Sequence, residues 1–413
     1  MVIYSCIEEV CMPIDFNTNM FFINNNRPVF QSFAQGSYLS ANNEKDTFVK
    51  SVKVPDSKSL YDGVKITKKS FGKIEKSGEG ATLYTITNKN GASVDLSTFG
   101  ATIVGVKVPD KDGKIIDVAQ GYSSVTPYEK SPIGHAGGTI GPVANKINNG
   151  TFFLNGKEYK LTCNKDNGKT HSHGAEAGLD VKNWRAEVLK DGIKFTYLKK
   201  DMDGGYPANV RISATYKFDN NNNLKLIYEA ESDADTILNL TNHSYFNLDG
   251  VENAHEGSVM EHIVQLPNSS RYTPVNEIAI PTGEIKSVEG TDFDFREAKK
   301  LSTMNKNGYD QNYVVDRYTG LKMIDVAKVK SEKTGVEMKV STNLPGFQFY
   351  TANNLGKSAQ PEGKNGKRYE KHSSFCVEPQ FFPDAINSFD EKPILKKGEK
   401  YNRTIEYSFS VNK

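Results

Sequence analysis

The stretch VRISATYKFDNNNNLKLIYEA, residues Val210 to Ala230, decides the fold class. In its first arm, apolar side chains at every second position alternate with mostly polar ones, which is the period of a β-strand with one face on a core. These apolar positions are Val210, Ile212, Ala214, Tyr216 and Phe218. A second β-rich arm runs from Leu224 to Ala230, and the turn-forming run Asp219 to Asn223 separates the two. The stretch therefore predicts two antiparallel strands joined by a short loop.

Two further segments repeat this device. Thr151 to Leu161 (TFFLNGKEYKL) has two β-rich arms around Asn155-Gly156, a dipeptide that favours positive φ at both centres of a type I′ turn. Ala186 to Leu198 has the same form around Asp191-Gly192. Both segments predict β-hairpins.

From Val64 onward, short β-like runs follow one another between Gly, Asn and Asp breakers, with one or two helical turns expected at Phe295 to Met304. There is no βαβ rhythm and no internal repeat of 20 to 50 residues. We therefore expect an all-β domain over residues 64–413, built as a large antiparallel β-sandwich or a barrel. Residues 1–63 differ in composition and are expected to be an N-terminal extension. This extension is an ordered segment packed on the main domain, a weakly structured segment or a misassigned start.

Composition excludes several partners. The 52 Lys and Arg residues against 50 Asp and Glu leave a net charge of +2, too balanced for a polyanion binder, so no nucleic acid is expected. No run approaches the roughly 18 apolar residues of a membrane helix, and mean hydropathy is −0.56. Four cysteines do not suggest a disulfide framework, and Glu8 and Glu9 interrupt the most apolar N-terminal stretch. A cytoplasmic protein is expected.

Two polar segments have an open interpretation from the residues alone. Gly134 to Gly150 (GHAGGTIGPVANKINNG) is rich in glycine, which lets a backbone approach a ligand closely but is also ordinary loop material. In Thr170 to Trp184 (THSHGAEAGLDVKNW), His171 and His173 form a His-x-His pair. Zinc needs more ligands than this pair supplies, so no metal is expected. Trp184 either stacks on a sugar or is structural.

Two other segments carry single ionisable residues. His243 in TNHSYFNLDG is either a satisfied structural group or a proton donor and acceptor near neutral pH. Glu378 in SFCVEPQFFPDAIN interrupts an apolar run, so it is either exposed at an edge or buried with a raised pKa in the range of a general base. Cys376, two residues earlier, shares its strand face and is expected to be a buried thiol.

Taken in order, these segments resemble the motif set of the aldose 1-epimerase (galactose mutarotase) family, from about Val64 to the C-terminus. TNHSYFNLDG is close to the NHxYFNL stretch of the family, whose histidine is the general acid, and this implies that role for His243. FCVEPQFFPDAIN is similar to the E-x-Q-x-x-P-D-A-x-N pattern, whose glutamate is the general base, and this implies Glu378.

The resemblance extends to residues that bind the substrate. The HGG…G-[FL]-D…W pattern fits the segment from His173 to Trp184, with His171 as the spare histidine. Asp310 in GYDQNYVV and Gln348 in PGFQFYTANN match the Asp and Gln positions of the family. The implied substrate-binding residues are Asn145, Lys146, His173, Asp310 and Gln348.

The sequence departs from the family pattern at several positions. Where the family usually reads GRxANRI, this chain reads GPVANKI over residues 141–147, so Pro142 and Lys146 replace two arginines. Lysine is a point charge without the planar fork of arginine, which predicts altered hydroxyl recognition. Ala175 replaces the second glycine of HGG.

The resemblance implies a galactose mutarotase-like supersandwich that interconverts the α and β anomers of free hexoses such as glucose and galactose. No metal or other cofactor is implied, and the protein would be a monomer or homodimer. An ionised Glu378 would remove the O1 proton while a protonated His243 protonates O5, which predicts a bell-shaped pH profile. The alternatives are a hexose-6-phosphate 1-epimerase, a glycoside hydrolase using Asp310 and Glu378, and a catalytically silent sugar-binding module on the same fold.

Overall fold

A computed structural model describes residues 52–53, 60–130, 134–303, 305, 307–356 and 361–412. All of them belong to the unit Phe48–Lys413. The extension expected over residues 1–63 therefore falls almost entirely outside the described residues. None of the described helices is long and apolar enough to span a membrane.

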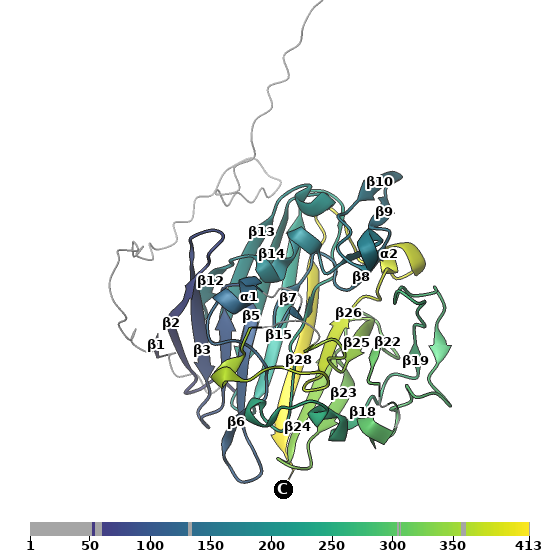
Figure 1. The fold of residues 1–413 in the computed structure, drawn as a ribbon. Helices are drawn as coiled ribbons and strands as arrows, with labels where there is room; N and C mark the ends of the chain where they lie inside the picture. Colours follow the sequence, from purple (N-terminus) through teal and green to yellow (C-terminus); the bar gives the residue numbers. More distant parts are fainter. Residues whose placement is uncertain are drawn as a thin grey trace, which may run out of the picture. The chain divides into compact units, whose positions relative to one another are not determined.

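The largest element is a nine-stranded antiparallel sheet (Figure 1). The hairpin predicted from the sequence forms its third and fourth strands. In spatial order its strands are β12 (Arg185–Val188), β13 (Ile193–Lys199), β14 (Val210–Phe218), β15 (Asn223–Ser232), β28 (Tyr401–Val411), β24 (Val336–Thr342), β23 (Ile324–Lys330), β18 (Ile263–Gln265) and β21 (Lys299–Lys300).

Two further antiparallel sheets complete the scaffold. One is six-stranded, in the order β1 (Val52–Lys53), β2 (Lys65–Lys73), β3 (Gly80–Thr87), β4 (Ser93–Ser97), β5 (Thr102–Pro109) and β6 (Ile115–Asp117). The other is five-stranded, in the order β20 (Lys286–Ser287), β19 (Arg271–Tyr272), β22 (Asp310–Val314), β25 (Gly346–Tyr350) and β26 (Cys376–Gln380).

Short elements connect these sheets. Four two-stranded ladders pair β9 (Thr151–Leu154) with β10 (Lys157–Lys160), β8 (Lys146–Asn148) with β11 (Thr170–Ser172), β7 (Thr139–Ile140) with β17 (Thr241–Asn242), and β16 (Thr236–Ile237) with β27 (Ile394–Leu395). The α-helices in the described part of the chain are the single turns α1 (Thr126–Lys130) and α2 (Ala385–Ser388).

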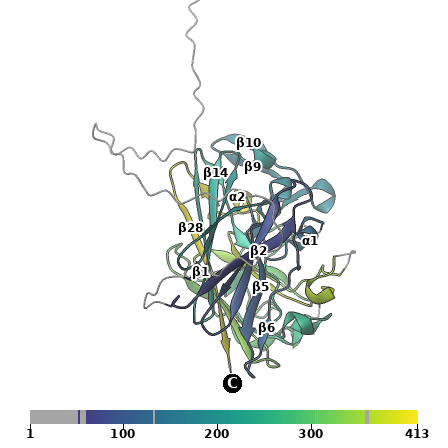
Figure 2. The ribbon, with the colours of Figure 1, turned by 90° about the vertical axis from the view of Figure 1, so that its left-hand side faces the viewer.

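The nine-stranded sheet buries one face. Along β15, the side chains of Leu224, Leu226, Tyr228 and Ala230 are buried while those between them are partly or fully exposed. One continuous hydrophobic cluster contains residues from all three large sheets, so the two smaller sheets cover this buried face. Figure 2 shows β14 and β28 on one side and β2 and β5 on the other. The expectation of an all-β sandwich is confirmed.

The hairpin expected at Thr151–Leu161 is also confirmed. Leu154 pairs with Lys157, and Asn155 and Gly156 have φ values of 52° and 77°, as a type I′ turn requires.

One local expectation is wrong and another is confirmed only in part. In the hairpin of β12 and β13, the amide of Leu189 donates to the carbonyl of Gly192 (2.8 Å), so Lys190 and Asp191 are the central turn residues. Neither Asp191 nor Gly192 has a positive φ, so the pairing is right but the type I′ turn is not. Where one or two helical turns were expected, at Phe295–Met304, the chain forms one 3-10 turn, η8 (Leu301–Thr303), preceded by the short strand β21. Pairing of β21 with β18 outweighs the weak local helix preference.

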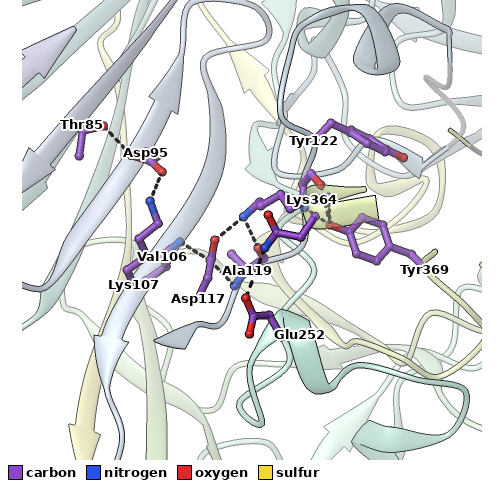
Figure 3. Close-up of polar contacts among 12 residues, drawn as sticks. Thr85, Asp95, Val106, Lys107, Asp117, Ala119, Tyr122, Glu252, Lys364 and Tyr369 are labelled. Atoms are coloured by element: carbon purple, nitrogen blue, oxygen red, sulfur yellow. Dashed lines mark hydrogen bonds and ion pairs between the residues drawn. The ribbon is translucent and has the colours of Figure 1, made fainter. Parts of the chain in front are cut away.

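A partly buried ion pair joins the connection between β25 and β26 to the six-stranded sheet (Figure 3). Lys364 Nζ donates to Asp117 Oδ2 and to the carbonyl of Ala119, both at 2.7 Å. The hydroxyl of Tyr369 donates to the carbonyl of Gly121 (2.5 Å). These contacts fix the segment that leads into β26, the strand that carries Glu378.

Candidate active site

A cavity of about 300 Å³ opens at the five-stranded sheet, large enough for a small ligand. All seven residues proposed from the sequence line it: Asn145, Lys146, His173, His243, Asp310, Gln348 and Glu378. The rest of the lining is His135, Lys165, Asp166, Ser172, Tyr245, Tyr350 and Asn354.

Three of the lining residues come from adjacent strands of one sheet. Gln348 on β25 lies directly opposite Glu378 on β26, and Asp310 is the first residue of β22. Side chains of directly paired residues lie on the same face of a sheet, so Gln348 and Glu378 both face the cavity. The amide Nε2 of Gln348 donates to Asp310 Oδ1 (2.6 Å), which links the third residue to this pair.

Two backbone hydrogen bonds fix the position of His243. It follows β17, and its amide donates to the carbonyl of Gly138 (3.0 Å) while its carbonyl accepts from the amide of Gly137 (2.9 Å). Its Nε2 atom lies 3.6 Å from Glu378 Oε2. The thiol of Cys376, on the same strand face as Glu378, lies 3.5 Å from the other ring nitrogen, Nδ1. Cys376 is fully buried, as expected from its position.

Two buried oxygen atoms in the cavity have no hydrogen-bond partner within the described part of the chain. They are Glu378 Oε2 and Gln348 Oε1. A buried polar atom without a partner is costly in free energy. Such atoms are suited to bind the hydroxyl groups of a polar ligand.

Burial shifts the proton affinities of both central groups. Desolvation, with a smaller contribution from the positive charge of His135, lowers the pKa of His243 to about 3. Desolvation, with repulsion from Asp310, raises the pKa of Glu378 well above its usual value. Burial thus favours an uncharged imidazole and a protonated carboxyl group, the reverse of the charge states expected from the sequence.

Two hydrogen bonds join His173 and Asn145. The amide of His173 donates to the carbonyl of Asn145 (3.0 Å), and the amide of Asn145 donates to His173 Nδ1 (3.3 Å). Because Nδ1 accepts, Nε2 carries the ring proton and is a donor. Gly174 permits this turn, since a Cβ there would lie 2.2 Å from the carbonyl oxygen of Gly141. Ala175 adopts φ 46°, so this position keeps a glycine-like backbone despite the substitution.

Lys146 reaches the cavity with its ammonium group already engaged. Nζ donates to the carbonyl of Ile278 (2.6 Å) and lies 3.4 Å from Asp166 Oδ2. Its charge also opposes the rise that burial causes in the pKa of Asp310.

Other histidine and tryptophan residues have structural roles. His171 is fully buried, with Nδ1 bonded to the carbonyl of Thr162 and Nε2 to the hydroxyl of Tyr206. Trp184 is buried in the main core and its Nε1 donates to the carbonyl of Leu179 (3.0 Å), so the sugar-stacking alternative is wrong. Among the described residues, the possible metal ligands that converge within 4.8 Å are His243, Cys376 and Glu378, and not His171 with His173.

Sequence reasoning missed His135. It was part of the glycine-rich segment, but no motif marked it. In the structure, His135 Nδ1 lies 2.7 Å from Asp180 Oδ2, and its ring centroid lies 4.8 Å from that of His173 and 5.9 Å from that of His243. A histidine within a run of glycines was the available signal.

The fold is an antiparallel β-sandwich with a polar cavity that holds an acid–base pair, and sequence comparison identifies its family. The sequence model of the aldose 1-epimerase family matches residues 82–408, and the chain belongs to that family. Galactose mutarotase of Sus scrofa is 38% identical over 356 residues, covering 84% of this chain and 99% of the relative. Aldose 1-epimerase of Haemophilus influenzae is 34% identical over 341 residues, covering 79% and 95%.

Solved structures agree with this assignment. The aldose epimerase homologue from C. elegans superposes with a TM-score of 0.72 at 32% identity, covering 80% of this chain and 99% of that one. Galactose 1-epimerase from Lactobacillus acidophilus also gives a TM-score of 0.72, at 25% identity, covering 85% and 100%.

Proposed function

We infer that the protein is an aldose 1-epimerase that interconverts the α and β anomers of free hexoses such as glucose and galactose. The observation that carries the proposal is the pair of Glu378 Oε2 and His243 Nε2, 3.6 Å apart in the cavity. The hemiacetal hydroxyl O1 and the ring oxygen O5 are both bonded to C1. A base and an acid that serve these two oxygens must therefore lie close together.

In the proposed reaction, Glu378 is the base and His243 is the acid. The Glu378 carboxylate takes the proton of the O1 hydroxyl, and the C1–O1 bond becomes a carbonyl. The C1–O5 bond breaks with its electron pair on O5, which takes a proton from His243 Nε2. Rotation about C1–C2 presents the other carbonyl face, and the reverse proton transfers close the ring to the opposite anomer. Each positioned group typically contributes about 10²- to 10⁴-fold in rate.

The charge states that burial favours fit this sequence of steps. After ring opening Glu378 carries the proton and His243 is neutral, which is the state that burial favours. The reactive form, with Glu378 ionised and His243 protonated, has the same total number of protons as the form that burial favours. Conversion between the two forms therefore depends on the bound sugar and not on bulk pH. The site thereby stabilises the open-chain intermediate.

The hydroxyl groups of the sugar are proposed to be held by Asn145, Lys146, His173, Asp310 and Gln348, which line the same cavity. His173 offers a donor at Nε2, and Gln348 offers an acceptor at Oε1. Charged and amide groups of this kind bind hydroxyls strongly.

The alternative of a phosphorylated sugar has less support. Three carboxyl groups, Asp166, Asp310 and Glu378, line the cavity against two ammonium groups, Lys146 and Lys165. Lys146 is also engaged by Ile278 and Asp166. A phosphate dianion would therefore have to displace Asp166 from Lys146.

Polarimetry tests the proposal. Fresh α-D-galactose or α-D-glucose should reach the same final rotation faster with the protein than without it. Glu378→Gln keeps the shape of the side chain but removes the base, and we expect about 10²- to 10⁴-fold lower kcat with native circular dichroism. Glu187→Gln, an exposed position on β12, is the matched control and should leave kcat unchanged. A fully active, folded Glu378→Gln variant would overturn the assignment of the base.

We further propose that residues 64–413 form the catalytic domain and that the protein works in the cytoplasm as a monomer or homodimer. The seven proposed site residues all lie within that range, and Cys163 and Cys376 are free thiols, as a reducing compartment allows. Light scattering coupled to size-exclusion chromatography measures the oligomeric state. A stable assembly larger than a dimer would contradict this proposal.

A further inference from the structure

We propose that His135, oriented by Asp180, is a substrate-binding residue whose Nε2 atom forms a hydrogen bond with a hydroxyl group of the bound sugar. The inference rests on the proposed function and adds a specificity-determining residue that the sequence motifs did not identify. His135 lines the cavity together with His173 and His243.

The first argument is the partner of Asp180. This carboxylate has a side chain only 5% exposed, and within the described part of the chain its hydrogen bond is to His135 Nδ1 (2.7 Å). A carboxylate oxygen accepts, so Nδ1 carries a proton and donates. The bond fixes both the tautomer and the orientation of the ring, as carboxylates do for functional histidines.

The second argument is the free ring nitrogen. His135 Nε2 has no hydrogen bond to another described residue, although the side chain is 16% exposed and lines the cavity. Nε2 accepts in the neutral ring and donates in the cation. A sugar hydroxyl matches either state, because it both donates and accepts.

The third argument is the backbone that presents the ring. His135 has φ 48°, a left-handed conformation that is uncommon outside glycine and tends to mark functional sites. Its carbonyl accepts from the amide of Gly138 (3.0 Å), which closes the turn. Gly138 also allows the turn to approach Asp180, since a Cβ there would lie 2.7 Å from the Cβ of Asp180.

The same turn is joined to the proposed acid. The amide of Gly137 donates to the carbonyl of His243, and the amide of His243 donates to the carbonyl of Gly138. The amide group of Asn242 adds a hydrogen bond to the carbonyl of Gly137 (2.8 Å). His135 is therefore held at a fixed distance from His243, so a hydroxyl bound to His135 lies beside the reacting end of the sugar.

The test compares sugar binding and catalysis in His135→Phe, His135→Gln and Asp180→Asn. We expect His135→Phe, which keeps an aromatic ring without the nitrogen, to raise both KM and the calorimetric Kd for galactose roughly 5- to 50-fold, as one lost hydrogen bond would. His135→Gln retains a hydrogen-bonding group and should recover part of the loss. His255→Phe replaces an exposed histidine and is the matched control, with no change expected.

A double-mutant cycle separates binding from a purely structural role. Asp180→Asn alone should weaken binding less than His135→Phe, and the double variant should bind like His135→Phe alone, because Asp180 acts through the ring. The double variant also removes the buried charge that His135→Phe leaves unpaired. Galactose analogues that each lack one hydroxyl group identify the contact. The analogue that lacks the hydroxyl bound by His135 should have the same Kd for the wild-type protein and for His135→Phe.

Unchanged Kd and KM in folded His135→Phe, or equal weakening by that variant of every deoxy analogue, would overturn the inference. Calorimetry keeps this result distinct from the proposed function. If the wild-type protein binds galactose but does not accelerate mutarotation, the proposed function fails while the role of His135 in binding is still measured.

Discussion

The Nε2 atom of His243 lies 3.6 Å from the Oε2 atom of Glu378, and burial favours the uncharged form of each group. These two shifts have opposite effects on how stability depends on pH. Folding lowers the pKa of His243 from 6.5 to about 3, so its contribution is present above pH 6.5 and is lost as pH falls toward 3. Folding raises the pKa of Glu378 above 4.5, so its contribution is present below pH 4.5 and is lost as pH rises.

Above pH 4.5 the two contributions therefore change with pH in opposite directions in the wild-type protein, and single replacements studied between pH 4.5 and 6.5 should expose them. The free energy of unfolding of Glu378→Gln minus that of wild type should rise with pH, by at most about 1.4 kcal/mol per unit. For His243→Gln minus wild type, the difference should fall by about the same slope. Urea denaturation followed by circular dichroism across this range measures both. Parallel pH dependences in all three proteins would contradict the assigned shifts.

The same pair predicts the pH dependence of catalysis. The reactive form holds one proton shared between the two groups, and a second proton is added only near pH 3. Protonation of His243 should therefore cause no loss of catalysed kcat/KM as pH falls from 7 to 5, after the spontaneous rate is subtracted. A halving of kcat/KM centred near pH 6.5, where an unperturbed histidine titrates, would show that the pKa of His243 is not lowered in the working enzyme. The bell-shaped profile predicted from the sequence required an ionised Glu378 and a protonated His243, the charge states that burial disfavours.

The sequence predicted the sheets well because β-periodicity is a local signal. The hairpins at Val210–Ala230 and Thr151–Leu161 follow from alternation and turn residues alone. The turn at Lys190–Asp191 and the strand β21 were missed because cross-strand pairing, which is not local, decided them. Motif resemblance brought together residues from five separate segments, which periodicity could not have done.

The charge states of the site residues could not be predicted from the sequence. The charge states of Glu378 and His243 depend on burial by residues distant in the chain. His135 was missed for a related reason, since its partner Asp180 lies 45 positions away and the two are joined only in the folded chain.

Lys146 offers a test of the departure from the family pattern. Lys146→Arg should leave KM within about threefold of wild type, because a guanidinium can also donate to the carbonyl of Ile278 and pair with Asp166. Lys146→Met removes the charge and should raise KM roughly 10-fold. Steady-state polarimetry on both variants measures this. A large rise in KM in Lys146→Arg would show that the site is adapted to lysine.

The last prediction compares two lysines that each donate to an aspartate at 2.7 Å, Lys364 to Asp117 and Lys107 to Asp95 (Figure 3). The side chain of Lys364 is 14% exposed and that of Lys107 is 39% exposed. Lys364→Met removes a largely buried ammonium group that bonds both Asp117 and the carbonyl of Ala119, so we expect a loss of about 1–3 kcal/mol in the free energy of unfolding. Lys107→Met disrupts a more solvated pair and should lose about 0–1 kcal/mol.

Urea denaturation of both variants gives these two values. KM for galactose should be unchanged in either variant at temperatures where it is folded, because neither lysine lines the cavity. Equal losses of stability in the two variants would mean that burial does not decide the strength of these pairs. A raised KM in folded Lys364→Met would instead show that this ion pair, through the segment leading into β26, also sets the position of Glu378.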